Sequence, residues 1–168
     1  MSEGATVGRI VASPSRLASS AVAIVAQFAV QLIVGVLLAR TYAPTPGSAW
    51  LSVGAMPVPL RAFHYWGSAL LIVHCAAHVA AHLWTGRTGG EWRVRFLASV
   101  ALFACAFGFQ ITGNLLPWDK HGVQSAAIEG TIAARIPAVG GAIRTAMLNG
   151  DVPSGGTIML WWAIHRFL

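Results

Sequence analysis

Three long stretches without a charged residue dominate this chain of 168 residues. The charges that bound them, Arg16 and Arg40, Arg61 and Arg87, and Arg95 and Asp119, enclose 23, 25 and 23 residues. An α-helix rises about 1.5 Å per residue, so roughly 20 residues cross the ~30 Å hydrocarbon core of a bilayer. Only 10% of the residues are charged and the mean hydropathy is +0.66, whereas a soluble domain carries about a quarter charged residues. The sequence therefore predicts an all-α integral membrane protein, a bundle with three full membrane-spanning helices at 17–39, 62–84 and 96–115.

The remaining segments are a polar tail, a long loop and a short apolar end. We expect 1–16 to be an N-terminal tail and 17–168 to be one membrane domain. Within that domain, 117–155 is expected to be an outer-face loop with short helices, and 157–168 to begin a fourth helix that is too short to cross. Basic residues before the first stretch and between the second and third predict a cytoplasmic N-terminus by the positive-inside rule. The sequence pI near 10.7 is accordingly interpreted as topology and not as nucleic-acid binding.

The second apolar stretch carries four histidines, which are costly near the middle of a bilayer: His64, His74, His78 and His82. A separation of 14 residues turns a side chain through 1400°, about 40° short of four turns, so His64 and His78 share one face about 21 Å apart. Two imidazoles placed in this way suit two haems stacked in a helix bundle. Each histidine could instead form a hydrogen bond across helices or line a polar cavity. The spacing of four from His74 to His82 could also imitate a zinc site, although the stretch offers no carboxylate ligand.

Six motifs follow one another along the chain, beginning in the first apolar stretch and continuing to the chain end. They are AVQLIVGVLLARTYAPT, LRAFHYWGSA, HVAAHLWTG, TGNLLPWDK, ARIPAVGGAIRTAMLNG and TIMLWWAIH. In this order and at this spacing they resemble the N-terminal, haem-bearing part of cytochrome b from bc-type quinol-oxidising complexes. The chain is most similar to the short, split, chloroplast-type form of that family.

The resemblance implies which residues bind the cofactor. His64 and His165 would ligate a haem b nearer the outer face, and His78 would ligate an inner haem. Arg61 would meet a haem propionate, a role for which an always-charged, forked donor is suited. No residue of this chain is expected to be catalytic.

Small residues are expected where helices pass close to the cofactors. Gly35 and Gly113 match family glycines beside the outer haem, with ordinary small-residue helix packing as the alternative. The family glycines beside the inner haem fall at Ala21 and Ser99, which narrows that site. The fourth ligand would follow His165 by about four helical turns, beyond the end of this sequence. We therefore expect an incomplete chain or a split partner that completes the inner site, with another group capping that iron as the alternative.

The implied function is that of a b-type cytochrome subunit that carries electrons across the bilayer in a respiratory or photosynthetic quinol:electron-acceptor oxidoreductase, and that is not an enzyme on its own. The implied partners are a C-terminal cytochrome b half or subunit, a Rieske iron–sulfur protein and a c-type cytochrome, in a dimeric complex. We expect the bacterial cytoplasmic membrane as its location.

The substrate would be a quinol, bound in a pocket to which 114–135 contributes. Val123 and Gln124 stand where the family has aromatic residues, which puts that contribution in doubt. Asp119 and Glu129 are expected to be solvated loop acids, with a proton relay as the alternative. The alternatives are a dihaem membrane anchor of a dehydrogenase or hydrogenase, a haem-free helical scaffold, and a metal transporter that uses the histidines.

Overall fold

The computed structural model describes residues 13–167, and every regular element in them is helical. Among these residues, three segments are long and apolar enough to cross a membrane: Pro14–Ala39, Val58–Trp84 and Gly90–Leu115. The prediction of an all-α membrane protein is therefore confirmed. The chain divides into two compact units, one containing the chain up to Leu37 with Val58–Gly108, the other containing Leu38–Pro57 with Phe109–Leu168.

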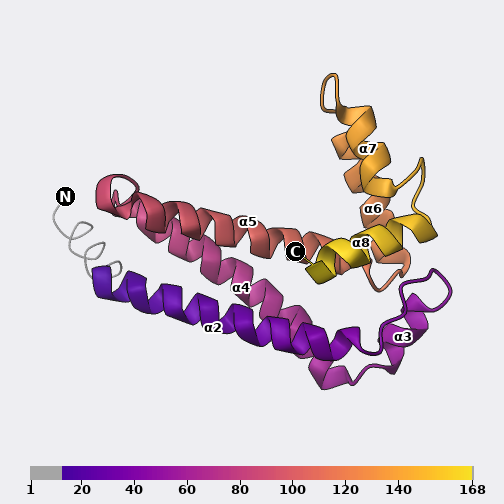
Figure 1. The fold of residues 1–168 in the computed structure, drawn as a ribbon, viewed down its shortest axis with the longest axis horizontal. Coiled ribbons are helices and arrows are strands. Elements are labelled where there is room, and N and C mark those ends of the chain that lie inside the picture. The colour runs from indigo at the N-terminus through magenta and orange to yellow at the C-terminus, as the bar shows by residue number, and fades with distance from the viewer. Residues whose placement is uncertain (1–12, 168) are drawn as a thin grey trace. The chain divides into compact units, whose positions relative to one another are not determined.

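The first unit contains most of helix α2 (Pro14–Ala39), helix α4 (Val58–Trp84), the short 3-10 turn η1 (Gly90–Trp92) and the larger part of helix α5 (Arg93–Leu115). Within this unit the three long helices lie side by side (Figure 1). Their common core consists of Ile24 from α2, Leu71 and Cys75 from α4, and Ala106 from α5. Large apolar side chains on the other faces are exposed, as lipid contact requires; examples are Val22, Leu32, Leu70, Val73 and Leu97.

The long helices begin before the charge-free stretches do. Helix α2 begins at Pro14, three residues ahead of the prediction, because Ser13 caps it: the Ser13 carbonyl accepts from the Leu17 amide at 3.0 Å, and its hydroxyl lies 3.4 Å from the Arg16 amide. Proline is suited to the first helical position. The charge-free stretch corresponds to the part of the helix inside the hydrocarbon core of the bilayer, whereas the helix itself extends beyond that core to its capping residue. Of the expected tail 1–16, the part before residue 13 lies outside the described residues.

The second unit contains helices α3 (Ala49–Ala55), α6 (Lys120–Ala133), α7 (Gly140–Leu148) and α8 (Gly155–Phe167). Helix α6 begins where the Asp119 carboxylate accepts from the Gly122 amide at 2.7 Å, so Asp119 is a cap and not only a solvated acid. Helix α7 ends at Leu148 and is capped by Asn149, which adopts the left-handed conformation with φ 49°. The segment 117–155 is thus mostly two helices joined by a short turn.

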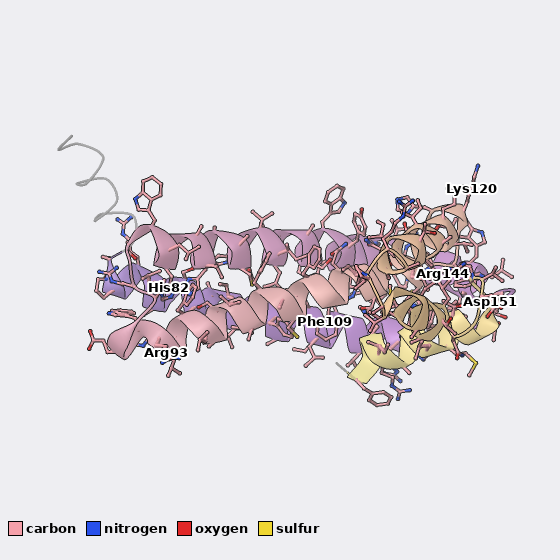
Figure 2. The ribbon with its side chains drawn as sticks, turned by 90° about the horizontal axis from the view of Figure 1, so that it is seen from above. His82, Arg93, Phe109, Lys120, Arg144 and Asp151 are labelled. Atoms are coloured by element: carbon pink, nitrogen blue, oxygen red, sulfur yellow. The ribbon has the colours of Figure 1, made fainter. Side chains whose placement is uncertain are left out.

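Helices α6, α7 and α8 pack on one another through a small apolar core. Its buried members are Leu115, Ala126 and Leu148, with the rings of Trp118 and Trp161 against them. The indole of Trp161 donates to the Met147 carbonyl at 2.9 Å, which fixes α8 to the end of α7. Side chains also close the loop that follows α7, where the Arg144 guanidinium donates to the Asp151 carbonyl at 2.7 Å; both residues are labelled in Figure 2.

Tyr42 anchors the connection between α2 and α3 inside this second unit. Its phenol donates to the Leu116 carbonyl at 2.6 Å, and its ring lies 4.7 Å from that of Trp162, measured between centroids. Burial raises the pKa of the Tyr42 phenol, so the group stays protonated and remains a donor. The contact ties the chain before α3 to both the end of α5 and the middle of α8.

Candidate functional site

His64 lies near the start of α4 and faces a glycine of α2. A β-carbon built on Gly35 would lie 3.2 Å from Cε1 of the His64 imidazole, closer than ordinary van der Waals contact. Only a residue without a side chain leaves the ring in this position. Arg61 precedes His64 by three residues, so the two lie on one face of α4, and both are half-buried.

His165 lies near the end of α8 in the second unit and faces α5. A β-carbon on Gly113 would lie 3.1 Å from Cε1 of its imidazole. The ring also meets Phe109 edge to face, with 5.4 Å between centroids. Each of the two predicted outer ligands therefore lies against a predicted glycine of its own unit. Because His64 and His165 belong to different units, their pairing on one cofactor stays a prediction.

Hydrogen bonds fix the orientation of the His165 ring. The Thr112 hydroxyl donates to the Phe109 carbonyl at 3.0 Å, so its oxygen is the acceptor for Nδ1 of His165 at 2.8 Å. A neutral imidazole that carries its proton on Nδ1 has a lone pair on Nε2. This is the form of histidine that binds a metal. Thr112 is buried, and its position in the sequence gave no sign of this role.

His78 lies on α4 in the first unit with only 6% of its surface exposed. Its Nδ1 lies 3.0 Å from the hydroxyl oxygen of Ser20 on α2. The ring of His82 meets it edge to face at 5.1 Å between centroids.

Ser99 stands where the resemblance places a small residue beside the inner haem. It is buried and donates to the Arg95 carbonyl at 2.7 Å. Ala21, the other such position, is half-buried.

The two other histidines of α4 are held by hydrogen bonds. His74 uses both ring nitrogens, to Gln27 at 2.9 Å and to Ser20 at 3.0 Å. His82, labelled in Figure 2, donates from Nδ1 to the Arg87 carbonyl at 3.0 Å and packs against Trp92 and Phe96. Among residues 13–167 no three His, Cys, Asp or Glu side chains are grouped to hold a metal ion.

Residues 69–168 match the family described as cytochrome b(N-terminal)/b6/petB. The chain belongs to this cytochrome b family. Among its relatives, the menaquinol:cytochrome c reductase cytochrome b subunit of Geobacillus thermodenitrificans is 30% identical over 146 residues, which cover 82% of this chain and 65% of that protein. Cytochrome b6 of Tupiella akineta is 28% identical over 148 residues, covering 84% and 68% of the two chains.

Cytochrome b6 of Heliobacterium mobile is 26% identical over 144 residues, covering 82% of this chain and 68% of the relative. The chain thus spans about two thirds of the length of these relatives. Membership of the cytochrome b family implies haem b binding. The family match contains His78 and His165, while His64 precedes it. The family match and the three apolar helices together identify an integral membrane protein.

Proposed function

We propose that this cytochrome b chain is the haem-binding membrane subunit of a bc-type quinol-oxidising complex. His64 and His165 would hold one haem b, and His78 would ligate a second. When bound, haem b supplies reversible one-electron transfer, and two imidazole ligands leave its iron no open position for oxygen. The alternative of a dihaem anchor for a dehydrogenase or hydrogenase is not favoured, since the three relatives named above are a menaquinol:cytochrome c reductase cytochrome b subunit and two cytochrome b6 proteins.

One observation carries the proposal: two predicted ligands in two separate units each lie against a helix glycine whose β-carbon would crowd the imidazole. The distances to Cε1 are 3.2 Å at Gly35 and 3.1 Å at Gly113. Simple helix packing needs small residues against a neighbouring backbone. Here a histidine side chain occupies the space beside the glycine in both cases, which supports these two glycines fixing where the proposed haem ligands lie.

The residues of this chain would bind the haem groups, orient their histidine ligands and shield them from water. Thr112 holds His165 with its Nε2 lone pair available for a metal, as Ser20 is placed to do for His78. Arg61, a half-buried residue about one turn before His64, carries a guanidinium that is suited to pair with a propionate. The apolar faces of α2, α4 and α5 exclude water, and low-dielectric burial tunes a haem potential.

The proposed partners are those that the resemblance to the cytochrome b family implies. Most of a quinol pocket would come from a C-terminal cytochrome b half or subunit. A Rieske iron–sulfur protein and a c-type cytochrome would complete the complex. Gln124 is exposed and Val123 half-buried on α6, so this segment would contribute little aromatic surface to that pocket.

The test is haem stoichiometry of the purified membrane protein, read from the haem-to-protein ratio and the reduced-minus-oxidised spectrum. His64→Ala, His165→Ala and the double variant should each lose the same single haem, since both ligands serve one iron. His121→Ala, at an exposed histidine of α6, is the matched control and should keep full haem content. Full haem in both single variants, or a double variant that loses more than either single one, would contradict the assignment.

A further inference from the structure

Four polar side chains of the first unit form one continuous hydrogen-bonded chain between α2 and α4. The amide oxygen of Gln27 lies 2.9 Å from Nδ1 of His74. Nε2 of His74 lies 3.0 Å from the Ser20 hydroxyl, which lies 3.0 Å from Nδ1 of His78. This chain ends at a ring that is 6% exposed, inside a segment able to span a membrane.

The Gln27 acceptor at the start of this hydrogen-bonded chain determines where each proton lies. An amide oxygen only accepts, so Nδ1 of His74 donates to Gln27 and Nε2 of His74 keeps its lone pair. The Ser20 hydroxyl therefore donates to His74, and its oxygen accepts from Nδ1 of His78. As a result, Nε2 of His78 carries no proton.

We propose that Gln27, His74 and Ser20 are positioning residues that hold His78 in the tautomer whose Nε2 binds the inner haem iron. The inference rests on the proposed function, because it takes His78 as a haem ligand. It gives His74 a task that the histidine spacing did not reveal. The second unit uses the same arrangement in a shorter form, with Thr112 accepting from Nδ1 of His165.

An acceptor on Nδ1 does more than orient the ring. Hydrogen bonding at the second nitrogen raises the basicity of a ligating histidine, which favours the ferric over the ferrous iron and lowers the reduction potential. Loss of such a partner commonly weakens metal binding about 10- to 100-fold. A tenfold loss of ferric preference corresponds to a rise of about 59 mV for a one-electron couple.

The decisive comparison is Ser20→Ala with Ser20→Thr in the purified holoprotein, followed by redox titration of the b-type absorbance. Ser20→Ala should raise the potential of one haem component and lower its retention roughly tenfold, while Ser20→Thr, which keeps the hydroxyl, stays close to the parent. Ser19→Ala, at an exposed serine of the same helix, is the control for a lost hydroxyl. Retention of the other haem shows that each variant is folded.

Gln27, at the start of the hydrogen-bonded chain, is tested in the same way. Gln27→Leu removes the acceptor for His74, so this variant should shift the same haem component as Ser20→Ala. His78→Ala identifies that component by removing it. Unchanged potentials in Ser20→Ala and Gln27→Leu, with one haem still lost in His78→Ala, would overturn the positioning role alone. If His78→Ala loses no haem, the proposed inner site and the positioning role both fail.

Discussion

A β-carbon on Gly113 would lie 3.1 Å from the imidazole of His165, and the two residues come from helices α5 and α8, which are separated by 52 positions in the sequence. Such a separation is tighter than nine in ten real contacts of a β-carbon. The glycine therefore sets where the histidine ring can lie.

Gly113→Val is expected to remove most of the haem held by His165, because the branched side chain occupies the place of the imidazole. Gly113→Ala should cause a smaller loss, since the ring need move only a few tenths of an ångström. Haem stoichiometry measures both variants. Gly141→Val provides the control, as a β-carbon there would meet nothing within 4 Å, and equal haem loss in this variant would show a general folding defect instead.

Thr112→Val should weaken retention of the same haem roughly tenfold, because valine has a similar shape but leaves Nδ1 of His165 without its acceptor. Thr112→Ser should restore most of the retention. Thr131→Val is a matched control, since Thr131 is exposed and its hydroxyl only donates to the Ala127 carbonyl of its own helix. Haem loss during detergent dilution is the measurement, and parent-like loss in Thr112→Val would remove Thr112 from the site.

The spans were predictable because a bilayer imposes one length and one polarity on every crossing helix. Charge-free stretches show that constraint directly, and the C-terminal ends of all three long helices fall where the predicted spans 17–39, 62–84 and 96–115 end: Ala39, Trp84 and Leu115. The starts were missed by three or four residues, because caps such as Ser13 lie outside the hydrocarbon and leave no trace in hydropathy.

The site was only partly predictable for a related reason. Histidine spacing along one helix indicates which rings share a face, so His64 and His78 stood out. Which side chains form hydrogen bonds across helices depends on how two helices pack against each other. The spacing of residues along one helix carries no information about that packing. Ser20, Gln27 and Thr112 were missed in this way, since each resembles an ordinary small or polar residue of a membrane helix.

Gly140, the first residue of α7, should be irreplaceable. A β-carbon there would lie 2.5 Å from the Ala134 carbonyl oxygen and 2.7 Å from that of Ala133, and backbone atoms cannot move aside cheaply. Gly140→Ala is expected to destabilise this helical pair by about 1–3 kcal/mol, as overpacking typically does. The neighbouring Gly141→Ala has open space and should be neutral or stabilising by up to about 1 kcal/mol. Hydrogen exchange of the α6 and α7 amides distinguishes them, and equal protection in both variants would contradict the steric argument.

Glu129 should make the stability of the protein fall as the pH rises. Burial on α6 raises the pKa of its carboxyl above the ordinary 4.5, so the folded state binds more protons than the unfolded state in the window between the two values. The stabilisation is complete below pH 4.5 and is lost as the pH rises through the higher folded pKa. Glu129→Gln, which stays neutral, should flatten this slope and be the more stable protein above the window. Thermal unfolding across that pH range measures the slope, with Glu91→Gln at an exposed acid as the control. A slope that survives in Glu129→Gln would assign the pH dependence to another group.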